Sequence, residues 1–306
     1  MLEGRVVPAG GFGRWMETDA ESVARRLALF VVEAPRRRLA DLVLPDDTRQ
    51  QLQSLLTKIR YHRLLYEEFG LGEIDPDGGR TAINLYGPPG TGKSFAAEAI
   101  AHELGLGIIR VNYAEVESKF VGETAKNIKA AFQKARESQA LLFFDEADSI
   151  LGRRLTNVSQ STDHAVNVSR SVMLLELDRF SGVAVFATNL AANYDTAFIR
   201  RILGHVALPL PDAAARRRLW RYHLPARMPV QLEAGDWERL VTETDGLAGG
   251  DILNSVVSAA ALALQREGPA CRIRLDDFLA AIRAIRHAKA VIGAPADKQL
   301  SSSPSV

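Results

Sequence analysis

Short apolar runs alternate with helical patterns through the middle of the chain. Five runs have the length and the aliphatic or aromatic content of buried strands, and they cover residues 82–86, 107–111, 140–144, 183–187 and 206–208. Strands that alternate with helices form parallel sheets covered on both faces. The pattern therefore predicts an α/β fold with a parallel sheet flanked by helices.

Two helical patterns precede the first strand. Thr18 and Glu21 form a capping-box pair, which opens a helix of about 15 residues that Pro35 ends. A second helix opens after Pro45 and stops at Gly70, a residue suited to a helix C-terminus.

Beyond residue 211 the sequence shows no further strand pattern and three helical patterns, at 212–224, 251–267 and 275–288. The last two carry apolar stripes at helical spacing. The first stripe consists of Leu253, Val256, Val257, Ala260 and Leu264, and the second of Leu275, Phe278, Leu279 and Ile282. A small helical domain is therefore expected after the sheet.

The length of 306 residues corresponds to about two domains of ordinary size. The patterns divide the chain into an N-terminal arm and helix (1–38), an α/β domain (39–211), a helical domain (212–292) and a tail (293–306). The tail is rich in Ser and Pro, so we expect it to be disordered.

Composition narrows the location and the kinds of partner. The formal net charge is +1, which gives no bulk attraction to nucleic acid or to an anionic membrane. The single cysteine cannot form an internal disulfide, and neither a leader pattern nor an apolar run of membrane-spanning length is present. We therefore expect a cytoplasmic protein.

A phosphate-binding loop follows the first strand of the sheet. The residues Gly87, Pro88, Pro89, Gly90, Thr91, Gly92, Lys93 and Ser94 match the pattern G-x-x-x-x-G-K-[ST], between a strand and a helix. Its backbone N–H groups and the helix N-terminus would surround a phosphate, and Lys93 would reach the β and γ phosphates. Ser94 is a candidate Mg²⁺ ligand. The expected ligand is ATP with Mg²⁺.

Two acids end the third strand of the sheet. An apolar run leads directly into Asp145 and Glu146, and adjacent carboxylates at such a place suit a bound cation and an activated water. We assign Asp145 to Mg²⁺, through its water, and Glu146 to polarising the water that attacks the γ-phosphate.

The same acids begin the tetrapeptide Asp-Glu-Ala-Asp, which is typical of a class of helicases. Those helicases carry two sheets, whereas one sheet and a helical region are predicted here, and no Ser-Ala-Thr follows the acids. The next strand ends instead at Asn189, whose amide would lie beside the γ-phosphate and the water.

Together, the phosphate loop, the acid pair, Asn189, a downstream arginine pair and a helical domain resemble the AAA+ ATPase family, over roughly residues 39–288. The resemblance implies a sheet of order 5-1-4-3-2, a helical lid and a ring, usually a homohexamer, with its sites between subunits. It places Arg200 and Arg201 where a neighbouring subunit supplies an arginine finger, with Arg201 the first choice. It also places Gly249 and Gly250 of the lid against the nucleotide.

Two departures from the family pattern bear on these roles. Many relatives have a further arginine in a Gly-Arg-Phe-Asp motif, where this chain has Gly204-His205-Val206, so a second finger is not expected. Many AAA+ proteins place a sensor arginine at the position of Gly250. The absence of this arginine here implies that the lid approaches the nucleotide through the lid's own backbone.

The resemblance also implies a pore loop after the second strand. Lys119, Phe120, Val121 and Gly122 match the aromatic, aliphatic and glycine pattern of ring unfoldases, in which Phe120 would grip a threaded polypeptide.

Residues 161–178 and 193–201 are similar to the pachytene-checkpoint type of AAA+ remodeller and its bacterial relatives. The resemblance implies a HORMA-domain protein as the client and a role in bacterial antiphage signalling through cyclic oligonucleotides (CBASS). Two alternatives stay open. One is a nucleotide-gated loader or scaffold on nucleic acid, although no nucleic-acid-binding motif is present; the other is an unfoldase for another client or for a separate peptidase.

Overall fold

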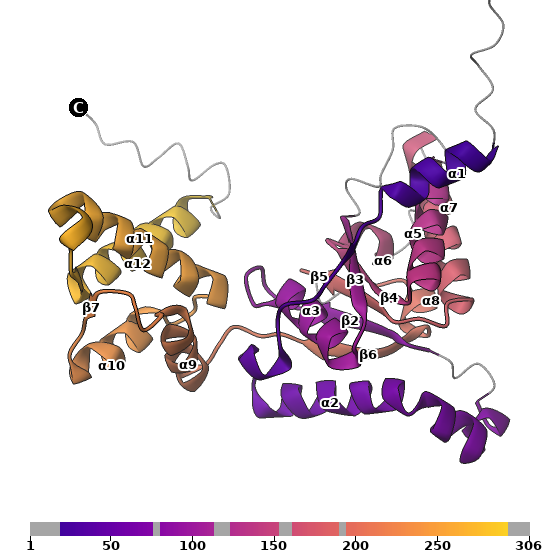
Figure 1. The fold of residues 1–306 in the computed structure, drawn as a ribbon, viewed down its shortest axis with the longest axis horizontal. Coiled ribbons are helices and arrows are strands. Elements are labelled where there is room, and N and C mark those ends of the chain that lie inside the picture. Colours follow the sequence, from indigo (N-terminus) through magenta and orange to yellow (C-terminus); the bar gives the residue numbers. More distant parts are fainter. Residues whose placement is uncertain (1–18, 76–79, 113–122, 153–160, 190–193, 293–306) are drawn as a thin grey trace, which may run out of the picture.

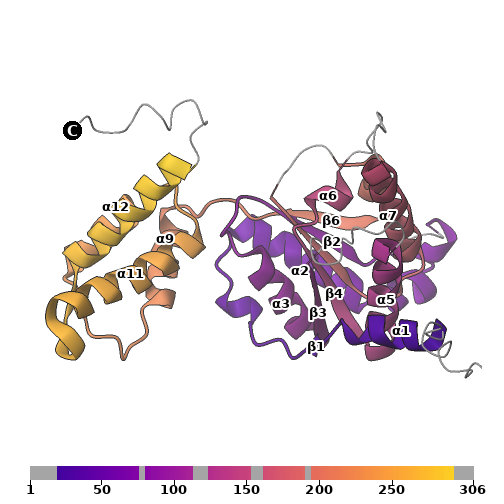
Figure 2. The same cartoon turned by 90° about the horizontal axis from the view of Figure 1, so that it is seen from above.

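The computed structural model describes residues 19–75, 80–112, 123–152, 161–189 and 194–292 of the chain. These residues form an α/β unit and a helical unit, joined by the segment that follows the last strand of the main sheet (Figures 1 and 2). No helix in these ranges is long and apolar enough to cross a membrane.

The main sheet contains the five predicted strands, which are β2 (Ala82–Tyr86), β3 (Gly107–Asn112), β4 (Ala140–Asp145), β5 (Ala184–Thr188) and β6 (Ile202–Ala207). They are parallel and lie side by side in the order β3-β4-β5-β2-β6. Numbered among themselves, this order is 2-3-4-1-5, so the expected order 5-1-4-3-2 is confirmed. Strand β6 begins four residues before the predicted run.

Both faces of the sheet are buried, as a parallel sheet requires. Alternate residues of β4 divide between two cores: Phe144 packs with α5 (Glu123–Ser138) and α7 (Ser161–Asp178), and Phe143 packs with α2 (Asp46–Arg60) and α3 (Lys93–Leu104). Figure 2 shows these two helix pairs on opposite sides of the sheet. On the first face, the ring centroids of Phe144 and Phe186 lie 5.1 Å apart in a stacked pair.

The N-terminal region differs from its prediction. Helix α1 spans only Asp19–Ala28, and β1 (Val32–Glu33) adds a sixth, antiparallel strand beside β3. The β-branched pair at Val31 and Val32 favours extended backbone, and Val32 pairs with Ile109. The helix therefore ends well before Pro35.

The second predicted helix is divided. After α2 come a π-helical turn, η2 (Leu64–Glu68), and a 3-10 turn, η3 (Leu71–Glu73). Gly70 lies between the turns with φ of +74°, a conformation that favours glycine, so the expected stop at this residue is confirmed. A further 3-10 turn, η1 (Leu39–Asp41), precedes α2.

Short elements connect the carboxyl ends of the strands to the rest of the α/β unit. Helix α6 (Asp148–Leu151) follows β4 directly, and α8 (Thr196–Ile199) precedes β6, with the Asp195 carboxylate accepting a hydrogen bond from the N–H of Ala197.

The helical unit contains α9 (Ala213–His223), α10 (Ala234–Glu243), α11 (Gly249–Glu267), a 3-10 turn η4 (Gly268–Ala270) and α12 (Leu275–Ile292). Its core includes Trp220 and Phe278, whose rings meet edge to face at 5.5 Å. The prediction missed α10, and it was wrong to exclude further strands: β7 (Val230–Gln231) and β8 (Ile273–Arg274) form a small parallel sheet. Strands of two residues are too short to show a period.

The predicted stripe of α11 is correct only in part, since Val256 is buried and Ala260 is partly buried, but the other three residues are exposed. Leu253, Val257 and Leu264 are exposed by 42%, 61% and 49%, whereas the buried residues of α11 are Ile252, Ser255, Val256, Ala259 and Ala263. The buried face carries small side chains, which let α11 lie close to α12, so the larger aliphatic residues did not mark the core. The predicted stripe of α12 is confirmed, since Phe278, Leu279 and Ile282 are buried.

Candidate functional site

The phosphate loop lies where the sequence placed it, between β2 and α3. Gly90 has φ of +78°, and a side chain on Gly87 would lie 2.2 Å from the backbone oxygen of Leu208. The positive φ of Gly90 and the close approach of Leu208 to Gly87 therefore each require glycine. The turn tightens further because Thr91 Oγ1 donates to the Pro88 oxygen at 2.9 Å.

Lys93 is the first residue of α3, and its side chain is directed back over the loop. Its Nζ donates to the backbone oxygens of Gly87 (2.7 Å) and Pro88 (3.0 Å) and to Asn189 Oδ1 (2.8 Å). Burial lowers the pKa of the Lys93 ammonium, and the carboxylates of Asp145 and Asp148 oppose this effect. The ammonium thus stands in a partly dehydrated place, where a phosphate would be a strong partner.

Ser94 and Asp145 meet at the same edge of the sheet. Ser94 Oγ donates to Asp145 Oδ2 at 3.0 Å. A hydroxyl and a carboxylate fit Mg²⁺, which is usually held by few protein groups together with substrate phosphates and water. Among the described residues, no group of three or more His, Cys, Asp or Glu side chains could hold a metal ion by itself.

Glu146 follows β4 in a left-handed backbone conformation, with φ of +52°. Such a conformation is uncommon for a residue other than glycine and costs about 1 to 3 kcal/mol. The N–H of Glu146 donates to Asp145 Oδ1 at 3.0 Å, and the N–H of Ala147 donates to the Ala187 oxygen at 2.9 Å. These bonds fix the backbone at Glu146, while its exposed side chain lines the cavity described below.

Asn189 lies at the end of the neighbouring strand, as predicted. Its N–H donates to both carboxylate oxygens of Asp148, at 3.1 and 3.2 Å, while its side-chain oxygen accepts from Lys93. Asp148 therefore positions Asn189. This role was not predicted, because in the sequence Asp148 was considered only as the last residue of the tetrapeptide Asp-Glu-Ala-Asp.

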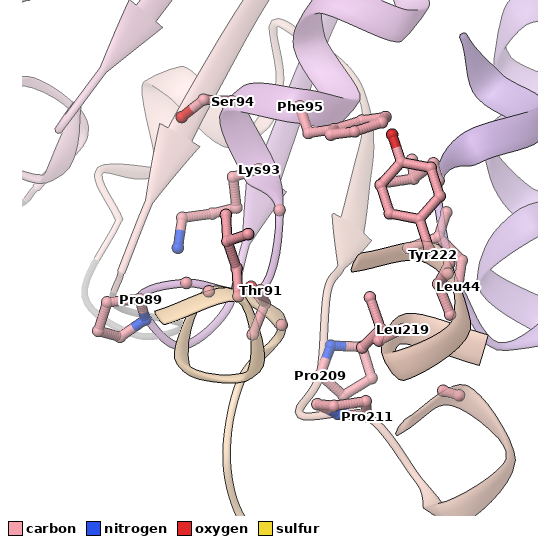
Figure 3. Close-up of a pocket in the computed structure, with 18 of the residues that line it drawn as sticks. Leu44, Pro89, Thr91, Lys93, Ser94, Phe95, Pro209, Pro211, Leu219 and Tyr222 are labelled. Atoms are coloured by element: carbon pink, nitrogen blue, oxygen red, sulfur yellow. The ribbon is translucent and has the colours of Figure 1, made fainter. Parts of the chain in front are cut away.

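These residues line a cavity of about 430 Å³ between the loop and the helical unit. Figure 3 shows Lys93 and Thr91 on one side, and Leu44 and Tyr222 on the other. The second side is largely apolar and includes Leu44, Pro209, Pro211, Leu219 and Tyr222. Leu42, Val43 and Pro45 also line the cavity. The cavity thus combines a polar, phosphate-sized end with an apolar end suited to a flat ring.

The sequence did not predict the apolar end. Its residues come from the segment before α2, the linker after β6, and α9, so no local motif joins them. His223 also lines it; burial and the nearby charge of Arg37 lower the pKa of this imidazole, against a smaller effect of its hydrogen bond with the Gly249 backbone.

The helical unit contacts the phosphate loop through backbone. The N–H of Gly250 donates to the Gly90 oxygen at 3.0 Å, and a side chain on Gly250 would lie 3.4 Å from the Gly90 Cα. Gly249 and Gly250 both line the cavity. The backbone of the helical unit thus reaches the phosphate loop, while its contact with a nucleotide stays a prediction.

The arginine pair lies after α8, and its members differ in environment. The Arg201 guanidinium forms a two-pronged ion pair with Asp178 (Nε to Oδ1, 2.6 Å; Nη2 to Oδ2, 2.8 Å), which raises its pKa. The Arg200 side chain is exposed, and its guanidinium makes no hydrogen bond or ion pair within the described part of the chain. Neither residue lines the cavity of its own chain.

The predicted pore loop, Lys119, Phe120, Val121 and Gly122, lies outside the described residues, so its role stays a prediction.

Comparison with known proteins identifies relatives of the whole core. Residues 83–210 match the family described as "ATPase family associated with various cellular activities (AAA)". The proteasome-activating nucleotidase of Methanopyrus kandleri is 31% identical over 270 residues, covering 86% of this chain and 59% of the relative. Vacuolar protein sorting-associated protein 4B of Mus musculus is 32% identical over 233 residues, covering 72% of this chain and 49% of the relative.

Solved structures show the same fold. The AAA domain of FIGL-1 matches with a TM-score of 0.69 at 21% identity, over 92% of this chain and 93% of that domain. The same domain in complex with ADP also matches with a TM-score of 0.69, at 20% identity. This chain spans only about half to three fifths of the length of the two curated relatives named above.

The contact between Gly250 and Gly90 allows a test of how the helical unit affects nucleotide binding. Gly250→Val would push α11 away from the phosphate loop, so we expect nucleotide affinity to fall about tenfold or more. Gly235→Val is the matched control, because Gly235 is also the second residue of a helix and a side chain there meets nothing within 4 Å. Titration with a fluorescent ADP measures both. Equal affinities for the two variants would contradict the proposed contact.

Proposed function

The chain belongs to the AAA family of ATPases, and from this we propose that it is a ring-forming enzyme that hydrolyses ATP to remodel a protein client. The observation that carries the proposal is the cavity in which the phosphate loop, Asp145, Glu146, Asn189 and the helical unit converge. Its polar end fits a triphosphate, and its apolar end fits a nucleobase.

ATP binding would use groups that already meet at the phosphate loop. The Lys93 ammonium would exchange its hydrogen bonds to the loop oxygens for bonds to the β and γ phosphates, and the loop N–H groups would donate to phosphate oxygens. Ser94 and Asp145 would hold Mg²⁺, directly and through water, and the ion would neutralise phosphate charge. Gly249 and Gly250 would enclose the nucleotide through their backbone.

Hydrolysis needs a base and a group that orients the attacking water. Glu146 is the base we propose, because its carboxylate lines the cavity and its backbone is fixed in an uncommon conformation. Asn189, which lies within hydrogen-bonding distance of Lys93, would orient the water or sense the γ-phosphate.

We propose a homohexamer because the resemblance to AAA+ ATPases implies a ring whose sites lie between subunits. Among the described residues no arginine lines the cavity, and Arg200 and Arg201 lie outside it, so either could serve a neighbouring subunit as the finger. Arg201 remains our first choice, as the resemblance implies. Its partner Asp178 is 45% exposed, so the carboxylate can be taken up by water when the guanidinium turns to a phosphate. The γ-phosphate would have to replace the two hydrogen bonds of this pair.

For the client we favour a HORMA-domain protein of bacterial CBASS antiphage signalling. This rests on the similarity of residues 161–178 and 193–201 to pachytene-checkpoint remodellers. The relatives support protein handling more generally, since one activates proteasomes and another acts in vacuolar protein sorting, by name. Phe120 and its neighbours would grip the client in the central pore.

Replacing the proposed base separates binding from turnover. Glu146→Gln keeps the size of the side chain and removes its basicity, so we expect ATP to bind with wild-type affinity while hydrolysis falls at least a hundredfold. Steady-state phosphate release and ATP titration measure the two effects. Lys93→Ala should lose binding as well. A Glu146→Gln chain with half the wild-type turnover would rule out this base.

Mixing inactive chains tests the finger in trans. We expect Arg201→Ala to bind ATP and to lose roughly a thousandfold in hydrolysis, with a much smaller loss for Arg200→Ala. An equimolar mixture of Arg201→Ala and Lys93→Ala chains should regain activity, because some interfaces combine an intact loop with an intact finger. No recovery on mixing, or a larger loss for Arg200→Ala, would contradict the assignment.

Client remodelling is tested separately from hydrolysis. Phe120→Ala is expected to hydrolyse ATP near the wild-type rate and to fail to open a HORMA-domain client. The fluorescence of a label on the client measures its opening. Phe69→Ala is the control, as Phe69 is exposed and lies outside the nucleotide cavity. Normal opening by Phe120→Ala would overturn threading. ATPase stimulation by DNA, and none by protein, would favour the loader.

A further inference from the structure

A second cavity of about 440 Å³ lies on the α/β unit, at the end of α2 that is far from the helical unit (Figure 1). Its lining comes from the C-terminal half of α2, the turns η2 and η3, Arg80 before β2, and Leu203 of β6. None of its residues lines the nucleotide cavity, so the two are separate.

Basic and hydroxyl groups gather at this second cavity. Lys58, His62 and Arg80 line it together with the hydroxyls of Ser54, Thr57 and Tyr66, and its lining includes no carboxylate. Lys58 has no ion pair within the described residues. The pair of Arg80 with Asp75 is loose, at 3.7 Å, with both side chains more than 40% exposed. The charge of Lys58 is therefore uncompensated, and that of Arg80 is only loosely paired.

The imidazole of His62 is held in place but incompletely satisfied. Its ring stacks on Tyr66 with centroids 4.5 Å apart and planes 12° from parallel. The His62 Nε2 is buried, and it has no hydrogen-bond partner within the described residues. A buried polar atom without a partner is costly, and in native proteins it often marks a place for a ligand or a water.

The backbone around His62 is also unusual. Tyr66 belongs to the π-helical turn η2, and such turns are rare and frequent at functional sites. Gly72 lets η3 approach this turn, since a side chain there would lie 3.0 Å from the Tyr66 oxygen. The chain thus folds tightly around this cavity rather than continuing α2 as a regular helix.

We propose that this cavity binds a small organic phosphate. A phosphate has several oxygens to satisfy, and the lining offers Lys58, Arg80 and the hydroxyls of Ser54 and Tyr66 as donors. The Thr57 hydroxyl already donates to the Gln53 oxygen at 2.9 Å. The cavity's volume of about 440 Å³ is close to the 430 Å³ of the nucleotide cavity, so it has room for more than the phosphate. Leu65, Leu71 and Leu203 provide an apolar surface for the organic part.

Phenyl phosphate is a suitable probe because it carries both chemical features. Phenyl phosphate is titrated calorimetrically into the full-length Lys93→Ala variant. This substitution removes the side chain that would bind phosphate in the nucleotide site. We expect saturable binding with one molecule per chain, about tenfold weaker binding of inorganic phosphate, and no measurable binding of phenol. Adding Lys58→Ala and Arg80→Ala together should weaken phenyl phosphate at least tenfold.

One further variant distinguishes a site from general charge attraction. Arg63→Ala removes a cation from the same region that does not line the cavity, so binding should not change. The proposal is overturned by the absence of saturable binding, by an equal effect of Arg63→Ala, or by phenol binding as well as phenyl phosphate.

Discussion

The ammonium of Lys93 is the interaction on which the arrangement of the nucleotide site depends. It is partly buried, and its three donors reach two loop oxygens and Asn189, so the loop, α3 and the end of β5 are tied to one atom. Only a parallel sheet allows this, because the carboxyl ends of β2, β4 and β5 then lie at the same edge. An ATP phosphate would replace these bonds with stronger, charge-assisted ones.

The helical unit adds what the sheet edge lacks. The polar end of the cavity belongs to the α/β unit, whereas Leu219 and Tyr222 of the apolar end come from α9. The two units meet at Gly250 and Gly90, where backbone touches backbone. With no side chain between them, the start of α11 is placed directly by the backbone of the phosphate loop.

Most of the fold and the polar half of the site could be predicted from the sequence, because both follow from local patterns. Strand β2, the loop and Lys93 are contiguous, and Asp145 and Asn189 each end an apolar strand. The apolar half could not be predicted, since Leu44, Pro209 and Tyr222 come from three separate segments. The buried face of α11 was misread because its small residues, such as Ala259 and Ala263, lie against α12. The strand β1 forms only because β3 offers it an edge.

The pair of Arg201 with Asp178 sets the condition that the proposed finger must meet. Asp178 ends α7 and Arg201 follows α8, so the pair links two helices outside the cavity of their own chain. Within the subunit the Arg201 guanidinium is already satisfied by the Asp178 carboxylate. In the ring that we propose, a neighbouring γ-phosphate would carry more charge than one carboxylate, and it would have to replace both hydrogen bonds of this pair. Assembly would then exchange a contact within one subunit for a contact with the next subunit's site.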